Sequence, residues 1–181
     1  MKKQLTSIIA VMGLAILSGC SLFQWAMPGT TLSDANVLAM LDTINIGEID
    51  AAHLAQQKAS SEEVKTFASR MLNEHTIMMQ DTRQLAQRIN VRPETPALAE
   101  NVGKTHKKTI DELRMLSGRD FDQAYLKYQI KMHEQTIDLV QATADSVDNS
   151  LLQQHLKKAR PDLDSHLSAA RALERQVIAQ N

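Results

Sequence analysis

Four polar side chains that are able to bind a metal ion interrupt otherwise apolar helix faces, namely Glu48, His75, His133 and His166. Each lies on a stripe of residues spaced three and four apart, which is the pattern of an amphipathic helix. Burying such groups without partners would cost about a few kcal/mol each, so they must bond to one another, to water or to an ion. Imidazole together with carboxylate suits zinc, iron, manganese or copper. The sequence therefore predicts a transition-metal site with these four ligands.

Two further carboxylates are candidates for the same site. Glu74 adjoins His75, and Asp162 lies four residues before His166, on the same helix face. Either is a candidate for an additional ligand or for a group that orients a ligand through a hydrogen bond. The alternative is a buried polar layer that fixes the register of the helices and binds no metal. Both interpretations require the polar residues to meet.

Methionines share these faces and give a second alternative. Met71, Met78 and Met79 share a face with His75, and Met132 adjoins His133. A thioether and imidazole site would suit cuprous ion. Methionine is also a flexible filler of apolar cores, and this role is the favoured one here.

Five helices are expected to position these residues. Ser60 and Glu63 form a capping box before the second helix, Asp120 caps the fourth, and Pro161 should kink or restart the fifth. The prolines of Val91 to Pro96 end the second helix. The first expected helix covers about 33–58, and the second follows the capping box to about 90. The third covers about 97–116, and the fourth follows Asp120 to about 147. The last follows the turn Asp148-Asn149-Ser150, with core-facing residues from Leu152 to Val177.

Loop lengths predict how the helices are arranged. Short links make the first two helices antiparallel, and likewise the last two, whereas about 30 residues separate the hairpins and carry the chain back along the molecule. We expect an all-α, ferritin-like four-helix bundle with a short extra crossover helix between its second and third long helices. At 1.5 Å rise per residue, the three histidines lie roughly 23 to 27 Å from the hairpin turns, so they share one depth.

The remaining histidines serve as a comparison set. His53 points about 140° away from Glu48 and is expected at the surface. His106 lies among Lys104, Lys107 and Lys108, which indicates a solvated face. His155 lies near the second hairpin turn and is ambiguous.

The N-terminus predicts export and lipid attachment. Lys2 and Lys3 precede the apolar run 8–17, which is too short to span a bilayer and reads as a signal peptide covering 1–19. Leu17-Ser18-Gly19-Cys20 resembles the bacterial lipobox, so Cys20, the only cysteine, is the predicted site of acylation. Ser21 favours the outer membrane by the same resemblance. Residues 20–32 read as a tether and 33–181 as the helical domain.

Composition excludes several classes of function. The net charge of the full chain is −1, and the signal contains two lysines and no acidic residue, so no electrostatic case for nucleic-acid binding exists. Aromatic residues make up 3%, which is typical of a helical protein rather than a sheet. We find no nucleophile arrangement, phosphate-binding glycine loop or pair of catalytic carboxylates, so no enzyme activity is predicted.

Two sets of segments give the chain a family resemblance. They are Gly47 to Ala55, Val64 to Ala68, Met71 and Glu74 to Thr76 in the first half, and Phe121-Asp122, Tyr125, His133, Arg160 to Leu163 and His166 in the second. In these residues the chain resembles a bacterial envelope family known as domain of unknown function 4142. The resemblance implies a ferritin-like fold and export. Di-iron relatives carry Glu-x-x-His pairs, and Asp50-x-x-His53 is the sole acidic analogue here, so iron-oxidising chemistry is not expected.

Two functions therefore remain open at the level of sequence. The first is an outer-membrane lipoprotein, facing the periplasm, that binds a divalent transition metal in its interior. The second is a structural or stress-related interaction lipoprotein whose buried polar layer only fixes helix register. In both, the lipid bilayer is the partner of acylated Cys20.

Overall fold

The computed structural model describes residues 32–179, which form five α-helices and no strand. The helices are α1 (Asp34–Lys58), α2 (Glu62–Arg88), α3 (Ala97–Arg114), α4 (Gly118–Thr143) and α5 (Ser150–Ala179). The all-α prediction is confirmed. The predicted signal peptide 1–19, the lipidation site Cys20 and almost all of the tether lie outside the described residues.

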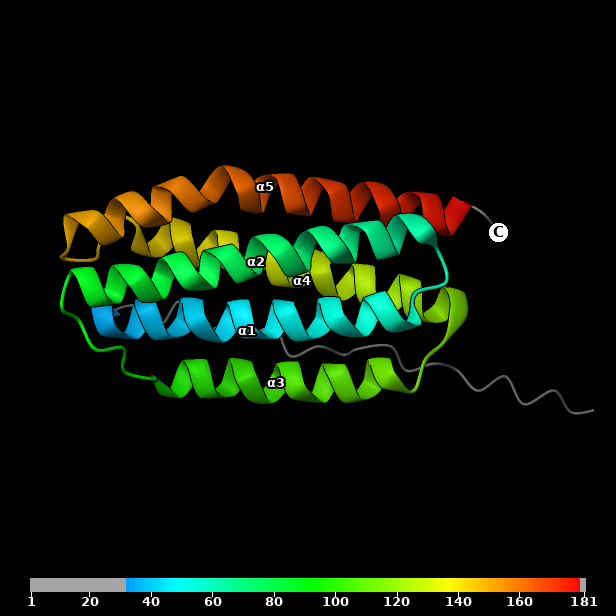
Figure 1. Cartoon of the computed structure of the whole chain (residues 1–181), viewed down its shortest axis with the longest axis horizontal. Coiled ribbons are helices and arrows are strands. Elements are labelled where there is room, and N and C mark those ends of the chain that lie inside the picture. Colours follow the sequence, from blue (N-terminus) through cyan, green and yellow to red (C-terminus); the bar gives the residue numbers. More distant parts are fainter. Residues whose placement is uncertain (1–31, 180–181) are drawn as a thin grey trace, which may run out of the picture.

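The helices pair as two hairpins that run along the length of the molecule (Figure 1). α1 packs against α2 and α4 packs against α5, while α2 contacts α5 and α1 contacts α4 across the interior. α3 lies along α1 and carries the chain back, so that α2 and α4 run in the same direction (Figure 1). No helix within residues 32–179 is both long and apolar enough to cross a bilayer.

The first hairpin turn differs in detail from the predicted capping box. Ser61, not Ser60, caps α2, and its hydroxyl oxygen accepts a hydrogen bond from the amide of Val64. The hydroxyl of Ser60 instead donates to the buried carboxylate of Asp122, which also accepts from the backbone amides of Ser60 and Ser61 at 2.9 Å. The cap prediction was wrong by one residue, because a long-range carboxylate engages Ser60.

A matching contact ties the second turn to the first hairpin. Asp34, in the first turn of α1, accepts hydrogen bonds from the amides of Asp148 and Asn149 at 2.9 and 3.0 Å. Each hairpin thus supplies a carboxylate that binds the turn of the other. These contacts fix the relative register of the two hairpins, and register decides which interior residues meet.

The prediction for the start of α4 was wrong in detail, whereas the kink, one of the two alternatives for Pro161 in α5, is confirmed. α4 begins at Gly118, after the capping position Ser117, so Asp120 lies in the first turn of the helix and is not its cap. α5 contains Pro161 without a break, and Figure 1 shows its axis bent near the middle. A proline removes one backbone hydrogen bond, and packing along the rest of the helix compensates for this loss.

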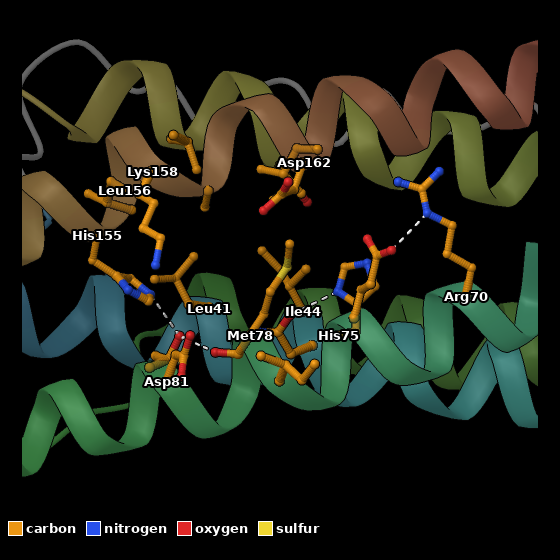
Figure 2. Close-up of a pocket in the computed structure, with 18 residues that line it drawn as sticks. Leu41, Ile44, Arg70, His75, Met78, Asp81, His155, Leu156, Lys158 and Asp162 are labelled. Carbon is orange, nitrogen blue, oxygen red and sulfur yellow. Dashed lines mark hydrogen bonds and ion pairs between the residues drawn. The ribbon is translucent and has the colours of Figure 1, made fainter.

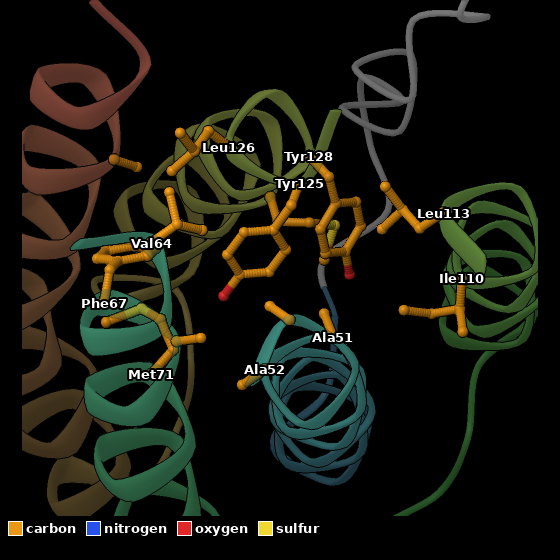
Figure 3. Close-up of a cluster of buried hydrophobic side chains, with 14 of the residues drawn as sticks. Ala51, Ala52, Val64, Phe67, Met71, Ile110, Leu113, Tyr125, Leu126 and Tyr128 are labelled. Carbon is orange, nitrogen blue, oxygen red and sulfur yellow. The ribbon is translucent and has the colours of Figure 1, made fainter. Parts of the chain in front are cut away.

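The core consists of two apolar clusters. One gathers toward the α1–α2 turn, where Tyr125 and Tyr128 lie over Ala51 and Ala52 (Figure 3). The other gathers toward the α4–α5 turn and includes Leu38 and Leu152. Large rings fit over α1 because its residues there are small.

A polar layer falls between the two clusters. On α5, His166 lies between Leu163 of one cluster and Ala170 of the other. On α2, His75 lies between Met71 and Leu85 in the same way. The predicted site therefore occupies the middle of the molecule.

Candidate metal centre

Three buried histidines from three helices meet in this polar layer. His75 of α2 and His133 of α4 are each 1% exposed, and His166 of α5 is fully buried. One ring nitrogen from each lies within 4.8 Å of the corresponding nitrogens of the others. Ring centroids are 5.1 to 5.5 Å apart. The prediction that these three residues share one depth is confirmed.

The hydrogen bonds of His133 and His166 leave two nitrogen lone pairs facing each other. His133 Nδ1 lies 2.9 Å from the backbone carbonyl of Gln129, an acceptor only, so Nδ1 carries the proton and Nε2 does not. His166 Nε2 lies 2.5 Å from the carboxylate of Glu74, which places its proton there and leaves Nδ1 bare. These bare nitrogens are 3.1 Å apart. Two facing lone pairs repel unless a cation or a proton lies between them.

His75 contributes a third bare nitrogen. Its Nδ1 lies 2.9 Å from the amide oxygen of Asn45, which accepts the ring proton. Its Nε2 is buried and has no hydrogen-bond partner within residues 32–179. All three rings thus donate to an oxygen on one side and turn an unprotonated nitrogen toward a common space. Histidines that bind metals are oriented by such outer hydrogen bonds.

Distances between the three nitrogens approach those of a metal complex. With zinc–nitrogen bonds of about 2.0–2.1 Å, tetrahedral ligand atoms lie about 3.3 Å apart. The His133–His166 pair at 3.1 Å already meets this spacing, and a nitrogen of His75 lies within 4.8 Å of both. Three protein nitrogens leave a fourth tetrahedral position open to water or another ligand.

The surroundings keep the three rings neutral. Burial lowers the pKa of His75 well below its usual value, and the neighbouring imidazoles lower it further. Burial lowers the pKa of His133 to about 4, and its hydrogen bond to Gln129 opposes this only in part. For His166, burial lowers the pKa more than Glu74 raises it. Neutral imidazole is the form that binds a metal.

Glu48 is buried nearby, but the structure does not bring it into the group of three. Its Oε1 is 3.9 Å from His133 Nδ1, the nitrogen that faces away from the common space, and its Oε2 accepts from Gln129 at 2.6 Å. Burial raises the pKa of Glu48 to about 8, against a smaller lowering by Gln129. At pH 7 Glu48 is therefore a neutral carboxyl behind His133. It lies outside the group of three because α1 places it one turn away from the three rings.

The two additional carboxylate candidates take different positions. Glu74 accepts from His166 and from Arg70, whose Nε lies 2.8 Å away. Burial raises the pKa of Glu74, but the hydrogen bonds and charges of Arg70 and His166 outweigh this, so its pKa is lowered and it stays ionised. Glu74 thus orients His166. Asp162 is exposed and lines a pocket beside His75.

The other histidines, His53, His106 and His155, lie outside the group of three rings. His53 is exposed, as predicted. His155 is half-buried, with Nε2 3.1 Å from the hydroxyl of Thr82. The prediction for His106 was wrong, because its ring is 10% exposed and packs between α1 and α4, with Nδ1 2.6 Å from the hydroxyl of Tyr128. The neighbouring lysines point outward while His106 occupies the inner face of α3.

Two residues with a role in the site were missed as site residues. Asn45 lay on the expected α1 stripe, and Gln129, four residues before His133, lay on the buried face of α4. A polar amide on a core stripe was the available signal. The backbone carbonyl that Gln129 also supplies has no signal in the sequence.

Comparison with known proteins identifies the family to which the chain belongs. The family model described as "Domain of unknown function (DUF4142)" matches residues 24–173. The chain belongs to this family. Searches of curated proteins and of solved structures gave no match. Family membership leaves the activity open, so the chemistry of the site has to carry the functional argument.

Proposed function

We propose that this family member binds one divalent transition-metal ion through His75, His133 and His166. The observation that carries the proposal is the direction of the protons: each ring gives its proton to an outer oxygen, and three bare nitrogens converge. Imidazole ligands suit zinc, copper, iron and nickel. Glu74 and Asn45 are oriented as outer groups that hold the rings.

A buried polar layer without metal is the competing function. In that case His166 is protonated at both nitrogens and donates to Glu74 and to His133, which resolves the repulsion between the facing lone pairs. This arrangement leaves the buried Nε2 of His75 without a partner among residues 32–179. A metal ion satisfies all three nitrogens, so the metal proposal accounts for one more observation.

We further propose the ferritin-like bundle as the fold and the outer membrane as the location. Support for the fold comes from the two hairpins, α1–α2 and α4–α5. α2 and α4 run in the same direction, and α3 is the crossover between them. Support for the anchor comes from the lipobox-like residues ending at Cys20. Several acyl chains would hold the domain on the periplasmic face of the membrane durably.

Elemental analysis tests the metal proposal. Protein purified without an affinity tag and incubated with zinc at pH 7.5 should retain about one ion per chain after dialysis, because three convergent histidine ligands bind zinc tightly. His133→Ala and His166→Ala should lose it. His53→Ala is the matched control, since His53 is exposed and remote from the three rings. Absence of metal in the wild type, or its retention in both core variants, would overturn the proposal.

A further inference from the structure

A pocket of about 360 Å³ opens between α2 and α5 and ends against the metal centre (Figure 2). Its inner wall includes His75, together with Asn45 and Glu74, which hold His75 and His166. His133 and His166 do not line it. Among the three histidines of the centre, His75 is thus the one that borders this pocket.

Carboxylates line the outer part of the same pocket. Asp81 and Asp162 are both exposed, and neither forms an ion pair within residues 32–179. Figure 2 shows Asp162 projecting from α5 over the pocket and Asp81 on the α2 side. Glu74, on the inner wall, adds a third carboxylate to the pocket, and Arg70 balances it at 2.8 Å. Lys158 is the opposing exposed cation on this wall.

The buried side chain of His75 links this pocket to the three-histidine group. Its Nε2 has no partner among the described residues, although the ring is 1% exposed. A cation that enters through this pocket meets His75 before it meets His133 or His166, which do not line it. Clefts with acidic walls concentrate cations and raise their association rates.

We propose that this pocket is the path by which the metal ion reaches the centre, with Asp81 and Asp162 as the capturing carboxylates and His75 as the first ligand. The inference rests on the proposed metal function and extends it to the route of loading. It concerns the rate of binding, whereas the metal proposal concerns binding itself.

Stopped-flow mixing of the full chain with Co²⁺ tests the path, because the visible absorption of the ion reports its coordination. The double variant Asp81→Asn, Asp162→Asn should bind about 3- to 10-fold more slowly than wild type, since it removes the attracting charges. Added salt should slow the wild type more than the variant. Lys158→Gln should bind faster than wild type.

A double variant at the other end of the molecule supplies the matched control. Asp111→Asn, Asp120→Asn changes the net charge equally at the α3–α4 end and should leave the rate within about twofold of wild type. Equal slowing by both double variants would show a general effect of charge and would overturn the path.

Filling the pocket gives a second measurement that does not depend on charge. Ala159 lines the pocket from α5 and is half-buried. Ala159→Phe should slow both Co²⁺ binding and its chelator-driven release by several-fold, with the ratio of the two rates unchanged. Ser168→Phe, at an exposed position of the same helix outside this pocket, is the control.

The outcomes separate the two proposals. If the wild type gives no cobalt spectrum, the metal function fails and the path fails with it. If cobalt binds with one ion per chain but the acidic and filled variants load at the wild-type rate, the path alone is wrong.

Discussion

Two histidine sites in this molecule share a buried ring nitrogen and differ in chemistry. His106 and His75 both lie on helices, and each has a buried Nε2 without a partner among residues 32–179. At His106 the other nitrogen meets the hydroxyl of Tyr128, and the nearest carboxylate, that of Asp50, lies 3.9 Å away. At His75 two further imidazoles complete a group within 4.8 Å.

The comparison shows that burial alone does not make a histidine a metal ligand. The ring of His106 fills the space above Gly47, where an added methyl group would lie 3.1 Å from it. His106 therefore acts as a packing residue between helices. The three-histidine centre differs in that several helices each contribute a ring whose outer proton is bound by an oxygen. Convergence and outer hydrogen bonds distinguish a candidate ligand from a packed ring.

Zinc should separate the two sites most strongly. At a free zinc concentration about a thousand times Kd, binding to the folded state alone raises the free energy of unfolding by about 4 kcal/mol. We expect this increase in wild type and in His106→Ala, and its loss in His133→Ala. Urea unfolding with zinc and with a chelator measures it. An equal gain in both variants would contradict the assignment of His133 as a ligand.

The pH dependence of the metal-free protein should give the next largest difference. The pKa of His133 is about 4 in the folded state, against 6.5 when unfolded. Between these values the unfolded state binds the extra proton, so stability is complete above pH 6.5 and falls as the pH drops toward 4. The pKa of His106 is also lowered by burial, but Asp50 opposes the shift.

With chelator present and Glu48→Gln as the background, we therefore expect the free energy of unfolding to fall by about 3 kcal/mol between pH 7 and pH 4 on account of His133. In that background His133→Gln should show a shallower slope, whereas His53→Gln should leave the slope unchanged. All measurements need Glu48→Gln as the background, because the pKa of Glu48 is about 8 and its proton stabilises the folded state increasingly below that pH. Identical slopes in the His133 and His53 variants would exclude the buried neutral ring as the cause.

Sequence periodicity predicted the helices and the three rings well, because both depend on local spacing. His75, His133 and His166 each interrupt an apolar stripe, and equal distances from the hairpin turns are enough to place them at one depth. The place of Glu48 could not be predicted so closely, since one helical turn decides between a ligand and a neighbour of His133.

Local sequence patterns did not predict the features that depend on contacts between distant segments. Ser60 fits a capping box locally, yet Asp122, distant in sequence, binds its hydroxyl. His106 lies among lysines in the sequence, but the approach of α3 to Gly47 turns it inward. In both cases the local sequence fits the predicted structure, but a residue of another helix determines where the side chain lies.

A double-mutant cycle at Gly47 should give the smallest effect and the sharpest test of His106 as a packing residue. Alanine in the middle of a helix is favoured over glycine by about 1 kcal/mol. In wild type, however, the added Cβ lies 3.1 Å from the His106 ring, which Tyr128 holds on its other side. Overpacking of this kind costs about 1–3 kcal/mol, so Gly47→Ala should destabilise the protein by up to about 2 kcal/mol.

In the His106→Ala background the clash is gone, and the same Gly47→Ala change should stabilise the protein by about 0.5–1 kcal/mol. The sign reversal, measured by urea unfolding of the four proteins, gives the coupling between the two positions. Bound zinc per chain should be the same in all four, because neither position belongs to the three-histidine group. A Gly47→Ala effect of equal sign in both backgrounds would show that the ring yields to the methyl group. His106 would then be too loosely held to contrast with the fixed rings of the three-histidine group.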